Sequence, residues 1–378
     1  MDIIQTLAQE LDKDPRHVEN VVRLLDEGNT IPFIARYRKE LHGAMDDTAL
    51  RTLEERLQYL RNLDERREAV KKAIDEQGKL TEALSAAIDS AKTLAEVEDL
   101  YRPYKQKRRT RATAAREKGL EPLAALLLAQ ERDCPAPEDA AQAYIDPEKG
   151  VETAADALQG ANDIIAEMLS DDADIRKALR ELLMRQGHLR SLAATEEDSV
   201  YRLYYDFDQL LSKLAGHQIL AINRGEKEGI LSVTVLLDRD AALPLLRRAV
   251  VKPGSPAMEF IKAVCEDAYD RLIYPSLERE ARSTLTDSAN EGAIGQFALN
   301  LKPLLMQPPV KGKVTMGLDP GYRMGCKVAV VDGTGKVLDT AVVYPTYGQR
   351  QKEEAITTLA KLIRKHGVEH IAIGNGTA

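Results

Sequence analysis

The sequence has 378 residues, of which 44 % are hydrophobic and 30 % are charged. This balance is typical of a globular protein and excludes collagen-like and wholly disordered chains. At roughly 100 to 200 residues per domain, the length predicts two or three domains. The net charge of −8 argues against a uniformly basic nucleic-acid binder, although charge can still be concentrated locally.

The sequence shows neither a membrane span nor a secretory signal. Its longest strictly apolar run, Leu123 to Ala129, is far shorter than the roughly 18 residues that a span requires, so no membrane partner is expected. The N-terminus lacks a basic start followed by an apolar stretch. The cysteines, Cys134, Cys265 and Cys326, are odd in number and far apart, which predicts buried, reduced thiols in a cytoplasmic protein.

Helical patterns dominate the first 310 residues. Asp14 and Pro15 form an N-cap and first-turn pair, and Gly28 ends the helix that they begin. A long helix is predicted from about 47 to 77, because leucines recur three and four residues apart between mixed charges. Three further helices have predicted N-caps at Thr93, Thr153 and Ser170.

The middle of the sequence is less uniform. Residues 230–237 are β-branched and apolar, which predicts a strand. A helix is predicted from Ser255 to Leu305 with a break near Pro275, and the prolines at 308 and 309 indicate a domain boundary. The expected domains are a helical N-terminal domain, a mixed region with long helices and a C-terminal module, over 1–200, 201–310 and 311–378.

The C-terminal module has the order βββαβ. Its predicted strands and helix are 314–317, 326–332, 336–344, 349–366 and 368–373. This order, with an aspartate at the end of the first strand, is how a ribonuclease-H-like domain begins. About 65 residues are too few to cover both faces of such a sheet. We therefore expect a mainly α protein with a truncated ribonuclease-H-like α/β module, and a chain that is a piece of a longer protein.

Positive charge is concentrated in one segment, Tyr101 to Lys118. It holds eight basic residues and one acidic residue, so it carries +7 and leaves −15 on the rest of the chain. Arginine can bind a phosphate through two hydrogen bonds, lysine acts as a point charge, and tyrosine can stack on a base. The candidate nucleic-acid-binding residues are Lys105, Lys107, Arg108, Arg109, Arg111 and Arg116.

Two other interpretations of this basic segment stay open. Its arginines could pair with the acidic helices of the same chain, or the segment could be a solvated loop. Recognition of particular bases is not expected, because nothing in the sequence fixes these side chains in a groove. A smaller cluster, Arg36, Arg38 and Lys39 with Phe33, is either a contact surface or a charged helix face.

Five long motifs extend in order over almost the whole chain. They are GNTIPFIARYRKE, VEDLYRPYKQKRRTRATAAREKGLEPLA, RLIYPSLERE, GLDPGYRMGCKVAVVDGTGKVLDTAVVYP and IAIGNGTA, which begin at Gly28, Val97, Arg271, Gly317 and Ile371. These motifs resemble those of the Tex family of bacterial transcription accessory proteins. The resemblance implies a helical N-terminal region with a helix-turn-helix-like unit, followed by a YqgF, or RuvC-like, domain. It also implies helix-hairpin-helix units and an S1 RNA-binding domain, which we expect this chain to lack.

The basic segment and the resemblance together predict a non-enzymatic, nucleic-acid-associated transcription accessory protein without a cofactor. Because the S1 domain is a major nucleic-acid contact in the family, binding by this chain is expected to be weak and non-specific. The transcription machinery is the further partner that the resemblance suggests. Two alternatives stay open: a Mg²⁺-dependent RuvC-like nuclease that uses Asp319, and a scaffold that binds only proteins.

Asp319 stands where a RuvC-like nuclease places a metal-binding carboxylate. One carboxylate does not make a metal site, and the fourth strand ends at Ile373 without a neighbouring acid. We therefore expect Asp319 to accept backbone N–H bonds in its Pro-Gly turn, with a metal role as the minor alternative. Nor is a nucleotide site expected, because the following GYRMGCK is neither a P-loop nor an actin-like phosphate loop.

A zinc-protease pattern, H-x-x-E-H, starts at His366. Its two histidines should lie on one helical face, but Gly367 ends the helix between them and His370 belongs to a strand. No metal is therefore expected there.

Overall fold

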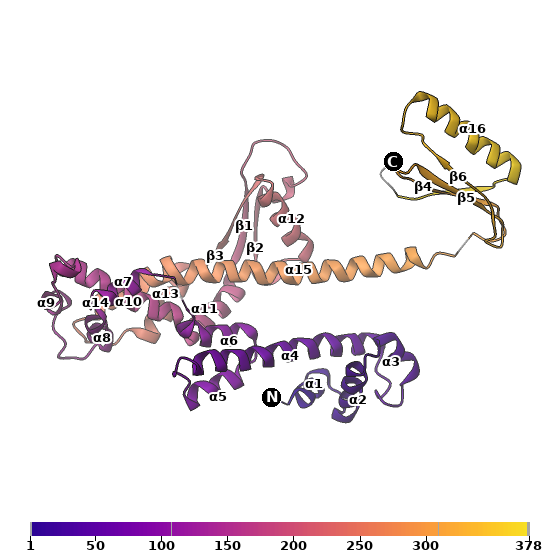
Figure 1. Ribbon diagram of the computed structural model, residues 1–378. Helices are drawn as coiled ribbons and strands as arrows, with labels where there is room; N and C mark the ends of the chain where they lie inside the picture. Colours follow the sequence, from indigo (N-terminus) through magenta and orange to yellow (C-terminus); the bar gives the residue numbers. More distant parts are fainter. Residues whose placement is uncertain (1, 107, 309, 376–378) are drawn as a thin grey trace. The chain divides into compact units, whose positions relative to one another are not determined.

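The structure is a computed structural model that describes residues 2–106, 108–308 and 310–375 (Figure 1). The chain forms two compact units, Met1–Ala293 and Ile294–Ala378. The mainly α fold expected from the sequence is confirmed, with two small sheets. The three domain ranges stay predictions. In the part of the chain that is described, no helix is long and apolar enough to cross a membrane.

Four helices form the N-terminal bundle. They are α1 (Ile3–Leu11), α2 (Pro15–Asp26), α3 (Ile31–Tyr37) and α4 (Asp47–Asp75). The first three pack on the first half of α4 around a core that includes Leu7, Val18 and Ile34. The Asp14 carboxylate accepts the Arg16 N–H and caps α2, as expected. The helix-turn-helix-like arrangement stays a prediction.

Short helices pack on the second half of α4. They are α5 (Glu82–Ser90), α6 (Leu94–Tyr101) and the 3₁₀ turn η1 (Arg102–Tyr104). Thr93 caps α6 by accepting the Glu96 N–H, as expected. This part buries its own cluster, which includes Leu63, Val70 and Val97. Its last turn, η1, is the first part of the basic segment.

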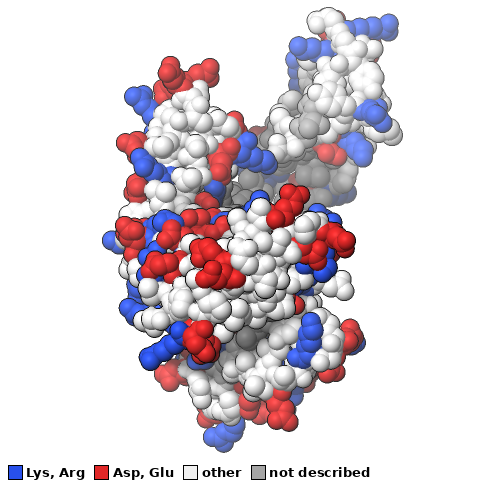
Figure 2. Space-filling model, turned by 90° about the vertical axis from the view of Figure 1, so that its left-hand side faces the viewer, with Lys and Arg blue, Asp and Glu red and all other residues white. Residues whose placement is uncertain are grey.

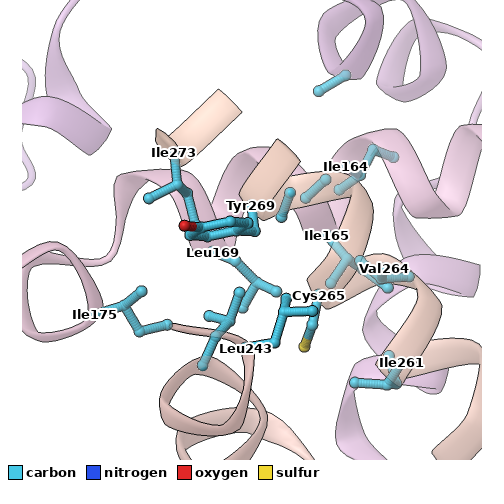
Figure 3. Close-up of a cluster of buried hydrophobic side chains, with 14 of the residues drawn as sticks. Ile164, Ile165, Leu169, Ile175, Leu243, Ile261, Val264, Cys265, Tyr269 and Ile273 are labelled. Carbon is cyan, nitrogen blue, oxygen red and sulfur yellow. The ribbon is translucent and has the colours of Figure 1, made fainter. Parts of the chain in front are cut away.

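The largest core surrounds α10 (Ala154–Asp171). The other elements of this part are α7 (Arg111–Glu117), α8 (Glu121–Ala129), α9 (Pro137–Gln142), η2 (Pro147–Lys149), α11 (Ala173–Gln186), α13 (Arg239–Val250) and α14 (Met258–Asp267). Side chains of α10 and α14 meet in the cluster of Figure 3. Cys134, Cys265 and Cys326 are buried and free, and burial raises the pKa of the Cys265 thiol to about 11.

The N-cap predicted at Ser170 is wrong. Ser170 lies buried in the last turn of α10, and α11 begins two residues later than expected. The Asp172 carboxylate caps α11 by accepting the Ile175 N–H at 2.9 Å. Aspartate and serine are equally good N-caps. Asp172 caps α11 because α10 continues through Ser170 and ends at Asp171.

A three-stranded antiparallel sheet follows α11. Its elements are β1 (His188–Ala193), β2 (Asp206–Leu210) and β3 (Leu231–Leu236), in the order β2-β1-β3, with the short turns η3 (Arg202–Tyr204) and η4 (Leu211–Lys213) and the helix α12 (Gly216–Lys227). The strand predicted at 230–237 is β3. α12 packs beside β3 (Figure 1).

The helix break predicted near Pro275 takes the form of a change of helix type and not of a gap. After α14 the chain forms a π-helical segment, η5 (Ala268–Ile273), and continues without a gap into α15 (Tyr274–Leu305). Pro275 lies in the first turn of α15, next to the wider π turn. Proline has no backbone N–H to donate, and this loss costs least in the first turn of a helix. The Tyr274 hydroxyl donates a hydrogen bond to the Val235 carbonyl, which ties α15 to β3.

The C-terminal module has the predicted βββαβ order. Its elements are β4 (Thr315–Asp319), β5 (Cys326–Val331), β6 (Val337–Val343), α16 (Gln349–His366) and β7 (His370–Ile373). The strand order is β6-β5-β4-β7, with β7 parallel to β4 and the other pairs antiparallel. α16 covers one face of the sheet (Figure 1), where Met316, Val330 and Leu362 are buried. The ribonuclease-H-like arrangement is confirmed.

Candidate nucleic-acid interface

Two arginines anchor the basic segment to α10. Arg102 Nε lies 3.2 Å from Asp171 Oδ1, and Arg116 Nη1 lies 2.9 Å from Glu167 Oε2. Both carboxylates are largely shielded from solvent, so these pairs hold the two ends of the segment. Arg116, a candidate phosphate ligand, is therefore engaged in an intramolecular contact.

Two further candidates form exposed ion pairs. Lys105 Nζ lies 3.7 Å from Glu98 Oε2, and Arg109 Nη2 lies 2.7 Å from Glu117 Oε2. Exposed pairs of this kind contribute at most about 1 kcal/mol, because water screens them and long side chains lose entropy. A phosphate could therefore compete for these cations at small cost.

Arg108 and Arg111 differ from their neighbours. Both are exposed, and in the described ranges neither has a carboxylate oxygen within 4.0 Å. Arg111 is the first residue of α7, which Thr110 caps. Lys107, the remaining candidate, lies outside the described residues. The segment is thus anchored at its ends and keeps exposed cations in its middle.

A polar cavity of about 200 Å³ lies beneath this segment. Arg102, Arg111 and Arg271 line it together with the carboxylates of Asp163, Glu167 and Asp171. Arg271 Nη2 donates to Asp163 Oδ1 at 2.8 Å. Because three arginines and three carboxylates line the cavity, it has no excess charge that would favour an anion.

The charges around the cavity also act on Asp267. Hydrogen bonds from Arg271 lower the pKa of the Asp267 carboxyl against the effect of burial, with smaller contributions from Asn162 and the charge of Arg111. On the face drawn in Figure 2, basic and acidic side chains are likewise mixed. The positive character of the segment is therefore local, as its sequence indicates.

Asp319 is exposed at the end of β4. Among the residues that the structure describes, none donates a hydrogen bond to its carboxylate, so the turn-capping role expected for it is absent. The same residues contain no group of three His, Cys, Asp or Glu side chains that could hold a metal ion. Asp319 lines the open face of the sheet with apolar neighbours such as Val342 and Ile373.

The two histidines of the zinc-protease pattern have separate environments. His366 Nε2 lies 3.0 Å from Asp339 Oδ2 on β6, whereas His370 pairs with Thr315 in the β4–β7 ladder. Hydrogen bonds from Lys365 and His366 hold the pKa of the Asp339 carboxyl well below its usual range. Lys365 and His366 thus connect α16 to β6 through Asp339.

Sequence reasoning missed a buried ionic cluster formed by Asp99, Arg176, Arg180 and Glu280. Arg176 Nε and Arg180 Nη2 each lie 2.6 Å from the Asp99 carboxylate, and Arg176 Nη2 lies 3.1 Å from Glu280 Oε2. Burial is the largest single influence on the Arg180 guanidinium and by itself lowers the pKa of Arg180. The hydrogen bonds and charges of Glu280 and Asp99 together outweigh it, so the pKa of Arg180 is raised. The cluster joins α6, α11 and α15 just before the basic segment begins. Its only signal in the sequence is that Asp99 and Glu280 fall within two of the long motifs.

The fold is therefore that of a helical scaffold that carries a basic surface segment, together with a ribonuclease-H-like module. Three family models match the chain: the Tex-like protein N-terminal domain at residues 1–75, the Tex central region-like domain at 133–297 and the Tex protein YqgF-like domain at 313–378. The chain belongs to the Tex family.

Individual relatives agree with this assignment. The chain is 46 % identical over 395 residues to "Protein tex" of Bordetella pertussis, covering 100 % of this chain and 49 % of the relative. It is 42 % identical over 393 residues to "Transcriptional accessory protein Tex" of Neisseria gonorrhoeae, covering 100 % and 50 %. It is 34 % identical over 396 residues to human "S1 RNA-binding domain-containing protein 1", covering 100 % and 39 %. The chain thus spans half or less of the length of these relatives.

Proposed function

We propose that this chain is a non-catalytic, nucleic-acid-binding part of a transcription accessory protein, and that residues 105–111 supply its phosphate contacts. The observation that carries the proposal is the exposure of Arg108 and Arg111 without a carboxylate partner in the described ranges. The anchoring of Arg102 and Arg116 supports it, because a segment fixed at both ends presents these cations at little entropic cost.

The names of two relatives supply the context of the proposal. One is a transcriptional accessory protein, and the other contains an S1 RNA-binding domain. We extend the transcription role and the link to RNA to this chain as part of the proposal, together with a contact to the transcription machinery. Three buried, free cysteines support a cytoplasmic location.

Salt dependence of binding tests the phosphate contacts. Each neutralised phosphate lowers log K by about 0.7 per tenfold rise in salt on single strands, so three to five contacts predict a slope of roughly −2 to −3.5. The expected dissociation constant is about 10⁻⁴ to 10⁻⁶ M, typical of non-specific binding. The double substitution Arg108→Ala/Arg111→Ala should flatten the slope by about 1.4.

A matched control removes two arginines from exposed ion pairs elsewhere, Arg202→Ala/Arg350→Ala, and changes the net charge equally. It should leave the slope unchanged. An equal flattening in both double variants would contradict a local contact at 105–111. No binding by the unaltered chain at low salt would contradict the proposed function and favour a scaffold that binds only proteins.

The non-catalytic part of the proposal has its own test. Purified chain should not cleave branched DNA in Mg²⁺ or Mn²⁺, because two-metal cleavage needs several carboxylates around the metals. Cleavage that disappears in Asp319→Ala would contradict this part and favour the nuclease alternative. Cleavage that persists in Asp319→Ala would indicate a contaminating nuclease, which repeated purification should remove.

A further inference from the structure

A second surface combines positive charge with aromatic rings at the end of α3. Phe33 and Tyr37 lie one helical turn apart, with ring centroids 5.3 Å from each other. The Arg38 guanidinium lies 5.0 Å from the Phe33 ring centroid, within cation–π distance. Tyr37 is 56 % exposed although it is a large aromatic residue. These side chains, with Arg36 and Lys39, are called the α3 platform below.

The charge of the α3 platform is not neutralised by its surroundings. Arg36 and Lys39 are exposed, and the part of the chain that is described holds no carboxylate oxygen within 4.0 Å of either cation. Glu40 is the only acid in the stretch 31–40, which also contains three basic residues. Unpaired cations next to an exposed ring are the combination with which proteins bind single strands.

The helix that carries the α3 platform is packed on the N-terminal core. Ile31 and Ile34, on the opposite face of α3, are buried in the N-terminal core. The Arg38 guanidinium donates to the Tyr37 carbonyl at 2.9 Å, which fixes the end of the helix. Asn20 Nδ2 donates to the Leu41 carbonyl at 3.1 Å and ties the next turn to α2.

The turn after α3 is also closely packed. Gly43 has φ +60°, and a Cβ there would lie 2.3 Å from the His17 ring. Only glycine fits this contact, so the turn is held against α2. A preorganised surface loses little entropy when it binds a ligand.

We propose that the α3 platform binds single-stranded nucleic acid, with Tyr37 stacked on an unpaired base and Arg36 and Lys39 on flanking phosphates. The proposal rests on the proposed function and extends it by naming the class of nucleic acid. A duplex keeps its bases stacked on one another, so it offers the Tyr37 ring no base face. Charge alone does not favour the single strand, because a duplex has the higher charge density. The exposed ring does favour it.

Substitutions at Tyr37 test the stacking contact. Binding of the whole chain to labelled oligothymidylate is measured at low salt by fluorescence anisotropy. Tyr37→Ala should weaken it about fivefold or more, the low end of base–aromatic stacking, and Tyr37→Phe should keep binding within about twofold. Tyr322→Ala is the matched control, because Tyr322 is also 56 % exposed but lies after β4. It should leave the affinity unchanged.

Other probes separate stacking from charge. Tyr37→Ala should not change binding to a DNA duplex or to inorganic polyphosphate, neither of which offers an unpaired base. Arg36→Ala/Lys39→Ala should flatten the salt slope on oligothymidylate by about 1.4. Circular dichroism should show unchanged helix content in each variant, because the altered side chains are exposed.

The outcomes distinguish the two proposals. If the unaltered chain binds none of the probes, the proposed function fails. If it binds and Arg108→Ala/Arg111→Ala flattens the slope while Tyr37→Ala has no effect, the proposed function stands and the α3 platform is wrong. Equal loss of duplex and single-strand binding in Tyr37→Ala would also overturn the stacking contact.

Discussion

The guanidinium of Arg176 lies 2.6 Å from the carboxylate of Asp99, and only 2 % of the Arg176 side chain is exposed. Removal of one member of a buried pair leaves the other charge without compensation. Asp99→Ala should therefore lower the free energy of unfolding by about 3 kcal/mol. Urea titration followed by circular dichroism measures this change.

An exposed pair beside this cluster provides the control. Lys177 Nζ lies 2.7 Å from Glu96 Oε1, and the lysine side chain is about half exposed. Lys177→Ala should change the unfolding free energy by less than about 1 kcal/mol. Similar effects of Asp99→Ala and Lys177→Ala would show that the buried cluster does not stabilise the junction of α6, α11 and α15.

Arg116→Ala should reduce stability without flattening the salt slope of nucleic-acid binding. Its guanidinium pairs with Glu167 on α10 and is therefore engaged within the fold. Loss of this partly buried contact should cost about 1 kcal/mol, measured as a lower urea midpoint with an unchanged m-value. A flatter salt slope of binding with unchanged stability would instead place Arg116 among the phosphate ligands.

Acid should remove the contribution of Asp267 to the stability of the folded protein. Its pKa is lower in the folded protein than in the unfolded chain, where it is about 3.9, chiefly because Arg271 donates hydrogen bonds to it. The stabilisation is therefore complete above that value and is lost as the pH falls through the lower, folded pKa. In Asp267→Asn, stability should be lower at pH 7 and should fall less steeply below about pH 4. If the melting temperatures of the two proteins fall equally steeply with decreasing pH below about pH 4, the prediction is contradicted.

Amide exchange should differ between β7 and β5. All four residues of β7 are exposed, and among the described residues the strand pairs only with β4, whereas β5 is bonded on both sides. Mass spectrometry should find faster exchange in His370–Ile373 than in Cys326–Val331. Unpaired edges also promote association, so slow exchange in β7 should appear only with concentration-dependent self-association. Equal protection in a proven monomer would contradict the exposed edge.

Elements with strong local signals were predictable from the sequence. α16 has the predicted bounds, because its apolar face is regular and Gly367 caps it with φ +61°. The strands β1 and β2 were not predicted. β1 begins directly after Gly187, and its burial alternates over only part of its length. Its identity as a strand depends on pairing with the distant β3, which no short window of sequence reveals.

The candidate interface was predictable only as a segment. Its composition indicated phosphate contacts or internal pairing. The structure shows internal pairing for Arg102 and Arg116, and the phosphate contacts stay a prediction. Arg102 and Arg116 face acids on α10 that lie about 50 to 70 positions away in the sequence, so no local pattern could identify them as partners. The same distance explains why the cluster around Asp99 and Arg176 was missed.

The number of residues in the π-helical segment Ala268–Ile273 determines the direction in which the side chains of α15 point. Each residue of an α-helix turns the following side chains by about 100°. Deletion of one residue from the segment would therefore rotate Glu280 away from Arg180 and Arg282 away from Glu226, two ion pairs that connect α15 to the rest of its unit. Substitutions that keep the number of residues leave the orientation of these side chains unchanged. The spacing between α14 and α15 is thus constrained more tightly than the identity of most residues within it.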